Sequence, residues 1–548
     1  MSDISVLQHE RLKYQPKTPE VFKNGLKKLQ CSDLSASTSV ADQDKLTEIF
    51  KETYGQNFID IISSENDAST EKLKVGVVLS GGPAAGGHNV IIGLFDGLKQ
   101  FNQDNELIGF IQGPGGIVDN QYKEITSELV DTYRNTGGFD MIQSGRTKIE
   151  TPEQFDACLK NCTDLGLDAL LVIGGDDSNT NAALLAEFFK SKQAKTRVLG
   201  APKTIDGDLK NEYIEASFGF DTACKVYAEL VGNICRDAIS SAKYWHFIKL
   251  MGRSASHIAL EVGLQTQINK VLIGEEVEAN KQTLKSIVDD LASMILARSN
   301  NGQNYGVVLI PEGIIEFIPE MGDLISTLND LLAHETETNA IKLIELALGK
   351  LSSEQGELLK SLPTNIQSQL VAERDPHGNV QVSLIETEKL LAEMVSTRMS
   401  ELKEKGEFKA KFGALTHFFG YEGRCAFPSN FDTDYTYGLG QVASILINSG
   451  KTGYIASLCD LNLSVSEWKP KGIPLTSMMN IERRHGKDKP VIKKALVELD
   501  GKPLKYYQSK REAWSIDDHY TFPGPVQFYG PTEICDIKSK SLILEKTK

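Results

Sequence analysis

The sequence lacks the long apolar runs of membrane-spanning helices, because no stretch of about 18 consecutive apolar residues occurs in it. The first residues, MSDISVLQHERLKYQPKTPEVF, do not contain the apolar core of a secretory signal peptide. An excess of basic charge is also missing: 59 Lys and Arg residues stand against 74 Asp and Glu residues, a formal net charge of −15. We therefore expect a soluble, cytoplasmic protein that binds neither membranes nor nucleic acid.

Cys-x-x-Cys pairs and internal repeats are absent as well. The eight cysteines are scattered without a Cys-x-x-Cys pair, which disfavours a cysteine metal site and is typical of reduced thiols in the cytosol. No repeat with a period of about 20–50 residues is present. With 40% hydrophobic and 24% charged residues, the chain is expected to bury a sizeable core. Its 548 residues suffice for about three or four domains, although large α/β enzymes often divide into two.

The most informative stretch covers residues 170–208. It begins with the apolar run LLVI, typical of a strand that is buried on both faces. A helix is then predicted to start at Ser178 or Asn179, with an apolar stripe along it. The second half repeats this order, with a short strand over 198–199 that leads into an acid-rich loop.

Four aspartates and one lysine stand where these two strands end. Asp176 and Asp177 follow the first strand, and Lys203, Asp206 and Asp208 follow the second. Because ligands of open parallel sheets bind outside the carboxyl ends of the strands, we expect these side chains to share one site. Carboxylates with a lysine suit Mg²⁺ and phosphate better than a carbohydrate or a peptide. The alternative is that the aspartates only cap helices, and it applies most to Asp177.

Three glycine-rich loops precede this stretch. The first, GGPAAGGHN, follows a buried strand over 75–79 and opens a helix, so its backbone at Gly82 can approach an anion. It is neither a Walker A loop nor a dinucleotide-binding turn, and such a turn also serves close packing. The third loop follows a predicted strand over 138–143 and carries Arg146 and Lys148, which are either phosphate ligands or solvated charges. Three such loops at one sheet edge favour phosphate binding.

The alternation of strands and helices continues after the central stretch. A helix over 217–240 precedes a strand over 244–250, and a further strand covers 307–310. From 321 to 408 the pattern becomes helical, rich in Leu and Glu, and then strand character returns. The loops at the ends of these strands contain the candidate residues Met251, Gly252, Arg253, Glu312, Tyr421, Glu422, Gly423 and Arg424.

These patterns predict an α/β protein with two similar Rossmann-like lobes, parallel-rich sheets, a helical insertion and terminal extensions. The N-terminal arm is expected to be helical around 21–29 and 46–62. The expected parts are a helical arm (1–73), a lobe that binds phosphate and metal (74–215), a second substrate lobe (216–320 with 409–470), a helical insertion (321–408) and a C-terminal extension packed on the body (471–548).

The residues of the central stretch suit phosphoryl transfer, which needs a base beside the nucleophile, cations on the moving group and metal ligands. Asp206 follows a strand and is flanked by Thr204 and Asp208, so it is the best candidate for the general base. Asp176 ends another strand and is the candidate Mg²⁺ ligand. Lys203 is placed to stabilise negative charge on a transferred phosphoryl group.

Five separate motifs carry a resemblance to a known family. They are GGDDS (174–178), PKTIDGD (202–208), MGR (251–253), PEG (311–313) and YEGR (421–424). Their order and approximate spacing resemble those of the phosphofructokinase family, and the match covers residues 74–320 and 411–460. The GGPAAGGHN loop and the helical insertion look most like its long, pyrophosphate-dependent branch.

The resemblance implies a reaction and a set of roles. It implies phosphoryl transfer from pyrophosphate to the 1-hydroxyl of fructose 6-phosphate, with Asp206 as proton acceptor, Asp176 on Mg²⁺ and Gly82 on diphosphate. Lys243 and Tyr244 would reach across a subunit interface into the partner's site, so function would require at least a homodimer. The residues that would bind the sugar phosphate are Thr204, Ile205, Asp206, Met251, Gly252, Arg253, Glu312, Tyr421, Glu422, Gly423 and Arg424.

Two residues indicate pyrophosphate rather than ATP as the donor. ATP-using relatives have glycine at the position of Asp177, whose carboxylate adds bulk and negative charge where the α-phosphate of ATP would lie. Lys203 replaces a smaller or uncharged residue and adds a cation. The chain departs from the family pattern at Pro83 and at Lys243, where aspartate and arginine are usual. The alternatives are an ATP-dependent 6-phosphofructokinase and a catalytically silent regulatory subunit.

Overall fold

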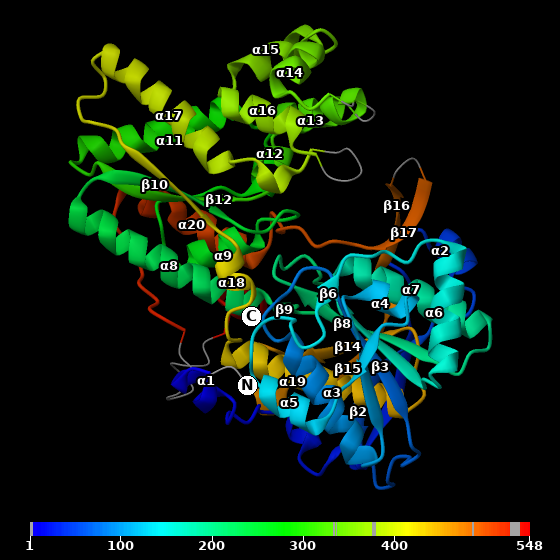
Figure 1. Cartoon of the computed structure of the whole chain (residues 1–548). Helices are drawn as coiled ribbons and strands as arrows, with labels where there is room; N and C mark the ends of the chain where they lie inside the picture. The colour runs from blue at the N-terminus through cyan, green and yellow to red at the C-terminus, as the bar shows by residue number, and fades with distance from the viewer. Residues whose placement is uncertain are drawn as a thin grey trace.

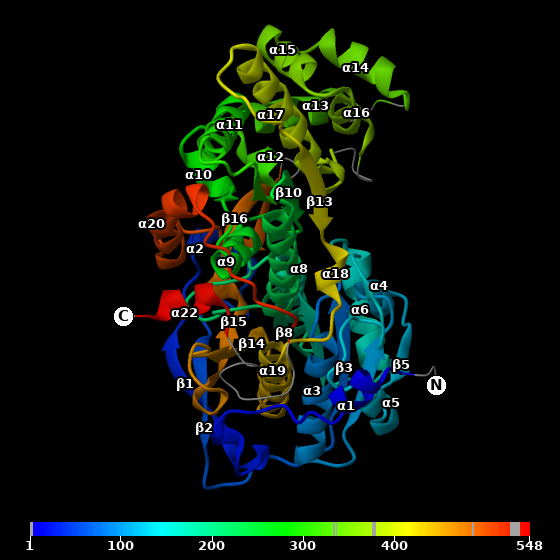
Figure 2. The same ribbon diagram turned by 90° about the vertical axis from the view of Figure 1, so that its left-hand side faces the viewer.

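The computed structural model of the chain describes residues 4–332, 335, 337–374, 380–484, 487–526 and 538–547. Two α/β lobes lie one above the other, and a helical insertion extends from the far end of the second lobe (Figure 1). The view turned by 90° shows the same stacking, with α18 between the lobes (Figure 2). The α/β fold with two Rossmann-like lobes is therefore confirmed.

The first lobe is built on an eleven-stranded sheet of order β1-β2-β15-β14-β8-β7-β3-β4-β5, with β6 beside β3 and β9 beside β8. Its centre, from β14 to β4, is parallel, and the outer strands pair antiparallel. The strands are β1 Leu29–Ala36, β2 Asn57–Ser63, β3 Lys74–Ser80, β4 Glu106–Phe110, β5 Tyr122–Glu124, β6 Ser144–Gly145, β7 Ala169–Gly174, β8 Arg197–Thr204, β9 Phe218–Gly219, β14 Tyr454–Cys459 and β15 Lys469–Pro474.

Helices cover both faces of this sheet. Successive side chains of a strand point to opposite faces, so Val77 packs into the core beneath α3 and α19 while Val78 packs into the core beneath α6 and α7. Burial on both faces explains why these strands read as continuous apolar runs. The helices are α3 Gly87–Phe101, α4 Pro114–Val118, α5 Ser127–Tyr133, α6 Pro152–Asp164, α7 Asp176–Ser191 and α19 Asn430–Asn448.

The second lobe contains a smaller, fully parallel sheet of order β11-β12-β10-β13. Ile248 of β10 packs into the core with α8 and α9, and its neighbour Phe247 packs into the core with α11 and α17. The elements are α8 Phe220–Ser241, β10 Tyr244–Leu250, α9 His257–Thr266, β11 Lys270–Val271, α10 Gly274–Ala279, α11 Leu284–Asn300, β12 Tyr305–Pro311, α12 Ile314–Phe317, β13 Ala414–Phe419 and α18 Tyr421–Arg424.

Helices form the insertion, and the C-terminal segment wraps over both lobes. In the insertion, Leu343, Leu359 and Leu370 bury their side chains in the core of the second lobe. Its helices are α13 Pro319–Leu332, α14 Ala340–Leu348, α15 Ser353–Ser361, α16 Thr364–Ala372 and α17 Thr387–Glu404. The C-terminal elements are β16 Met479–Arg484 and β17 Lys487–Ile492, which form a hairpin, and α20 Lys502–Ile516 and α22 Lys540–Lys546.

The prediction of a helical arm over residues 1–73 is wrong in part. Helices there are short (α1 Val6–Arg11 and α2 Gln43–Ile49), and β1 and β2 add two antiparallel strands to the first sheet. In β2 the buried side chains are Ile59 and Ile61, which alternate with more exposed ones. An alternation of period two is a strand pattern, and the helical interpretation of 46–62 missed it.

The assignment of residues 409–470 to the second lobe is also wrong in part. Strand β13 lies in the second sheet, but α19 and β14 return to the first lobe, where Tyr454 pairs with Leu199 of β8. The C-terminal extension begins in the first sheet too, because β15 pairs with β14. An apolar run predicts a buried strand but does not identify its partner strand, which depends on packing across the whole chain.

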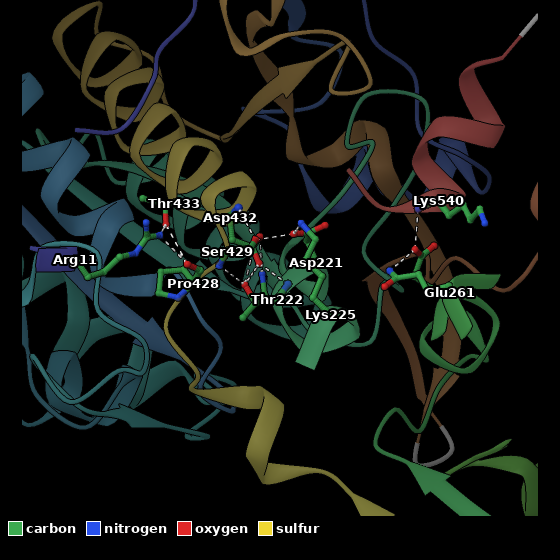
Figure 3. A network of polar contacts seen from close by, with 12 residues as sticks. Arg11, Asp221, Thr222, Lys225, Glu261, Pro428, Ser429, Asp432, Thr433 and Lys540 are labelled. Carbon is green, nitrogen blue, oxygen red and sulfur yellow. Dashed lines mark hydrogen bonds and ion pairs between the residues drawn. The ribbon is translucent and has the colours of Figure 1, made fainter. Parts of the chain in front are cut away.

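A buried polar network joins the beginnings of α19 and α8 (Figure 3). The Asp432 carboxylate accepts hydrogen bonds from the backbone N–H groups of Thr222, at 2.9 Å, and Gly219, at 3.2 Å. Ser429 donates through Oγ to Asp221, at 2.6 Å. Because α19 packs on the first sheet and α8 on the second, this network connects the two lobes.

Arg11 attaches the N-terminal segment to the same place (Figure 3). Its buried guanidinium donates hydrogen bonds to Asn430 Oδ1 at 2.7 Å, Pro428 O at 2.8 Å and Thr433 Oγ1 at 2.6 Å. The N-terminal segment thus contributes to the contact that positions the start of α19, a few residues after α18.

We expect the Arg11→Met variant to lower the free energy of unfolding by about 2–3 kcal/mol, because it removes hydrogen bonds from three buried acceptors. Denaturation in urea, followed by circular dichroism, measures the change. Lys13→Met is the control: Lys13 forms an exposed ion pair with Glu10, and such pairs contribute about 0–1 kcal/mol. Equal stability of the two variants would contradict the role assigned to Arg11.

Candidate active site

The predicted site residues other than Lys243 and Tyr244 meet between the lobes, at the carboxyl ends of strands β3, β7 and β8 of the first sheet and of β10 and β12 of the second. Loops after parallel strands face one edge of each sheet, and the two edges face each other across the site. The short helix α18 lies between the lobes in both views (Figures 1 and 2). Residues that are far apart in the sequence therefore share one site.

The glycine loop after β3 is surrounded by cations. A Cβ atom on Gly82 would overlap the guanidinium of Arg424 and lie 3.7 Å from Nη2 of Arg146, and one on Gly81 would lie 3.3 Å from Lys203 Nζ. Gly81 also has φ +86°, a left-handed conformation that favours glycine. Because these glycines carry no side chains, three positive groups approach the backbone of the loop closely.

Burial affects the pKa of Lys203 at the end of β8. Its side chain is buried, and the loss of hydration together with the nearby Arg424 lowers its pKa to about 8, against the attraction of Asp206. The ammonium group is therefore charged at neutral pH, and it is held in a poorly hydrated place where its charge acts strongly on a bound anion.

The helix after β7 begins two residues earlier than predicted. Helix α7 starts at Asp176 with Gly175 as its N-cap, so Asp176 and Asp177 both occupy the first helical turn. Asp177 pairs with Lys148, Oδ2 to Nζ at 3.3 Å, and Ser178 donates from Oγ to Ser80 Oγ at 2.7 Å. The first turn of α7 is thereby joined to the strand that leads into the glycine loop. Carboxylates in this turn also interact favourably with the helix dipole.

The strand predicted over 138–143 is not formed, and only β6, Ser144–Gly145, pairs with β3. Gly138 and Gln143 both have positive φ, which interrupts extended backbone. The apolar residues between them, Phe139, Met141 and Ile142, are buried under a loop instead. Arg146 and Lys148, which follow β6, nevertheless lie close to the glycine loop and to the start of α7. Arg146 is near Gly82, and Lys148 pairs with Asp177.

Asp206 lies among other acidic groups after β8. Burial and the neighbouring Asp208 and Glu312 carboxylates raise the pKa of Asp206 to about 6, against the opposing effect of Arg253. Its backbone N–H donates to Thr204 Oγ1 at 3.0 Å, which fixes the turn. An acidic group with a pKa near 6 is ionised at neutral pH and still basic enough to accept a proton.

The second lobe contributes Glu312, Gly252 and Arg253. The buried Glu312 carboxylate accepts a hydrogen bond from the Gly252 N–H at 2.9 Å, which ties the loop after β12 to the loop after β10. Burial raises the pKa of Glu312 above its ordinary value, against the opposing effect of the hydrogen bond from Gly252. Gly252 has φ +131°, so the loop depends on glycine at this position.

Helix α18 brings the YEGR motif against the first lobe. Arg424 donates from Nε to the Pro83 carbonyl at 3.3 Å, so its guanidinium lies beside the glycine loop. A Cβ on Gly423 would lie 2.7 Å from the ring of Tyr227, so this position has no room for a side chain. Glu422 accepts from the Gly420 N–H at 2.8 Å, while Tyr421 points outward with 73% of its surface exposed.

Lys243 and Tyr244 are not brought to this site. Both precede or begin β10, whereas Met251 follows its last residue, so the strand separates them by about 23 Å at 3.3 Å per residue. Tyr244 is 39% exposed, and the Lys243 ammonium lies over its ring at 5.2 Å. Within one chain they lie at the opposite end of the second sheet.

Sequence reasoning missed one charged residue of the site. Lys494, which follows β17, has its Nζ 3.7 Å from Asp176 Oδ2 and 3.7 Å from Asp208 Oδ2. It stands in the lysine-rich stretch PVIKKALVELD, which contains no local signal that separates it from the adjacent Lys493. Only the contact between the C-terminal segment and the two lobes identifies it.

In the described parts of the chain, no group of three or more His, Cys, Asp or Glu side chains is arranged to hold a metal ion. None of the described helices combines the length and apolar character needed to span a bilayer.

Comparison with known proteins gives consistent matches. Residues 74–361 match the family model described as Phosphofructokinase. The pyrophosphate–fructose 6-phosphate 1-phosphotransferase of Porphyromonas gingivalis is 52% identical and covers 99% of both chains, and that of Treponema pallidum (strain Nichols) is 52% identical over 99% of this chain and 97% of its own. A solved structure from Marinobacter aquaeolei, titled pyrophosphate-dependent phosphofructokinase, matches with a TM-score of 0.53 at 14% identity. The match covers 82% of this chain and 93% of that chain, and it supports the fold alone.

We expect the Gly82→Ala variant to bind pyrophosphate at least tenfold more weakly, because a methyl group there would overlap the Arg424 guanidinium and displace this cation from the glycine loop. Gly82 is not in the left-handed region, so alanine strains no backbone there. Titration calorimetry with pyrophosphate and Mg²⁺ measures the dissociation constant. Gly349→Ala, at an exposed position in the insertion, is the control. Unchanged affinity in Gly82→Ala would place the anion elsewhere.

Proposed function

The chain belongs to the phosphofructokinase family, and we infer that it transfers a phosphoryl group reversibly from pyrophosphate to the 1-hydroxyl of fructose 6-phosphate. The products are fructose 1,6-bisphosphate and phosphate, and the reaction belongs to glycolysis. Relatives that cover nearly the whole chain carry this activity in their names. The substrates are small molecules.

The position of Asp177 is the observation that most supports pyrophosphate as the donor. Asp177 lies in the first turn of α7, paired with Lys148 and joined through Ser178 to the strand before the glycine loop. A nucleotide would place a further phosphate next to this carboxylate and be repelled, whereas pyrophosphate ends before it. Lys203, on the other side of the loop, supplies the positive charge that the transferred phosphoryl group needs.

Asp206 serves as the general base in this proposal. Its carboxylate, ionised at neutral pH, accepts the proton of the 1-hydroxyl as the oxygen attacks phosphorus. Lys203 stabilises the charge that develops on the phosphoryl oxygens. Lys203 is the penultimate residue of β8, and Asp206 stands two residues after its end, in a turn that is fixed by the hydrogen bond from the Asp206 N–H to Thr204 Oγ1.

Mg²⁺ fits the donor side of the site. Burial raises the pKa of the Asp176 carboxyl, which means that its negative charge is poorly stabilised by the surroundings. A bound cation would stabilise this charge. Mg²⁺ characteristically takes one or two protein carboxylates and fills its other positions with water and phosphate oxygens, which agrees with the few ligands present. When bound, the ion would neutralise charge on the diphosphate; Asp176 would hold it, and Arg146 and Lys148 would hold the remaining anionic oxygens.

Fructose 6-phosphate is proposed to bind where the second lobe faces Asp206. Glu312 is held by Gly252 and is suited to accept hydrogen bonds from sugar hydroxyls. Arg253 and Arg424 supply charge for the 6-phosphate. The further residues proposed for this subsite are Thr204, Ile205, Met251, Tyr421, Glu422 and Gly423.

We further propose that the protein acts as a homodimer or larger homo-oligomer. Lys243 and Tyr244 lie at the end of β10 far from Met251, and they are exposed there. If they take part in sugar-phosphate binding, the site that they serve belongs to a partner subunit. An exposed Lys–Tyr pair at a sheet end supplies both a charge and a flat apolar surface for such a contact.

The donor assay tests the proposed function. Purified enzyme should phosphorylate fructose 6-phosphate with pyrophosphate and not with ATP freed of pyrophosphate. Turnover with ATP alone would overturn the proposal.

We expect Asp177→Gly to raise the KM for pyrophosphate severalfold and to allow measurable use of ATP. Asp177→Asn keeps the bulk and removes the charge, so it separates steric from electrostatic exclusion. An unchanged donor preference in both variants would contradict the role of Asp177.

The pH dependence follows from Asp206 and Lys203. The base must be ionised, so kcat/KM should fall as the pH drops below about 6. The lysine must be protonated, so kcat/KM should fall again as the pH rises above about 8. Initial rates between pH 5 and 9.5, the limits of this experiment, define both limbs. Lys203→Arg should remove the alkaline limb and keep the acidic one; an alkaline limb that persists in this variant would exclude Lys203 as its source.

A further inference from the structure

The C-terminal segment from Ile492 to Val497 runs between the two lobes beside the site. On the first lobe, the Ile492 N–H donates to Thr180 Oγ1 at 3.0 Å and the Ala495 N–H donates to the Asp208 carbonyl at 2.7 Å. On the second lobe, the Val497 N–H donates to Glu275 Oε1 at 2.9 Å. These backbone contacts fix the segment on both sides of Lys494.

The Lys494 side chain lies near Asp176 and Asp208, the aspartates that follow strands β7 and β8. Its Nζ lies 3.7 Å from Asp176 Oδ2 and 3.7 Å from Asp208 Oδ2, outside normal hydrogen-bonding distance of either. Among the described residues it donates one hydrogen bond, to Ser254 Oγ at 2.9 Å. A lysine ammonium has three donors, so two of them have no hydrogen-bond partner among the described residues.

The side chain is not needed to hold the segment in place. The backbone is already bonded to both lobes within two or three residues on each side, so the position of the segment does not depend on the Lys494 side chain. The charge does matter to a ligand. Asp176, Asp177, Asp206 and Asp208 all lie at this edge, and a diphosphate that approaches them is repelled unless additional cations offset the carboxylates.

We propose that Lys494 is a further diphosphate-binding residue, a cation that the C-terminal segment adds to the donor site next to Asp176. In the free enzyme it offsets the charge of Asp176 and Asp208, and with diphosphate bound its two remaining N–H groups donate to phosphate oxygens. This inference rests on the proposed function, and it adds a residue that lies outside the matched family region, 74–361.

The test compares Lys494→Met, Lys494→Arg and the neighbouring Lys493→Met, whose side chain is exposed and serves as the matched control. Titration calorimetry with pyrophosphate and Mg²⁺ gives the donor's dissociation constant without turnover. Initial rates give both KM values, and the melting temperature reports folding. We expect Lys494→Met to weaken pyrophosphate binding about tenfold or more, to leave the KM for fructose 6-phosphate within twofold, and to leave the melting temperature unchanged. Lys494→Arg should recover most of the affinity, and Lys493→Met should behave as wild type.

Unchanged pyrophosphate affinity in Lys494→Met would overturn the inference. So would a parallel loss of melting temperature and of affinity for both substrates, since that result indicates a structural role. The wild-type enzyme separates this failure from failure of the proposed function. If wild type turns over pyrophosphate and Lys494→Met is unaffected, only the inference is lost; if wild type shows no turnover with pyrophosphate, the proposed function is lost and the inference with it.

Discussion

Buried carboxylates repel a highly charged anion, and the structure around the site must offset this repulsion. Burial raises the pKa of Asp206 to about 6 and also raises the pKa values of Asp176 and Glu312, which shows that this region accommodates negative charge poorly. A protein of net charge −15 offers no general attraction for diphosphate. The attraction must come from individual cations, and Lys203, buried between the glycine loop and Asp206, is the central one.

The parts of this arrangement that depend on adjacent residues were predictable from the sequence. The apolar run at 170–173 forms β7, the glycine loop follows β3, and the motif residues fall at strand ends, because burial on both faces and turn chemistry leave local signatures. Errors arose where local signals were ambiguous: the start of α7 at Asp176, and the segment 138–143, whose apolar residues fill the core from a loop.

Contacts between distant segments were not predictable. The pairing of β14 with β8, the placement of Arg424 against Pro83 and the insertion of Lys494 near Asp176 all join segments more than 200 residues apart. No periodicity or spacing encodes such partners, since each is selected by the shape and charge of a surface that exists only after folding. Among the cations near the glycine loop, Lys203, Arg146 and Lys148 stand in loops that the sequence identifies, whereas Lys494 is recognised only from such a distant contact.

The same distant contacts explain why the charges of the site can be fixed in position. The lobes are joined beside the site. The C-terminal segment binds the first lobe through the Ala495 N–H, which donates to the Asp208 carbonyl, and the second lobe through the Val497 N–H, which donates to Glu275. In addition, the Asp432 carboxylate accepts from the Thr222 N–H. A displacement of one lobe against the other would break hydrogen bonds that also position Asp208 and the start of α19. Groups held in this way need little reorganisation as charge moves from donor to acceptor, which is the condition under which electrostatic stabilisation of a transition state is most effective. The contacts between the lobes are therefore part of the catalytic apparatus as well as of the fold.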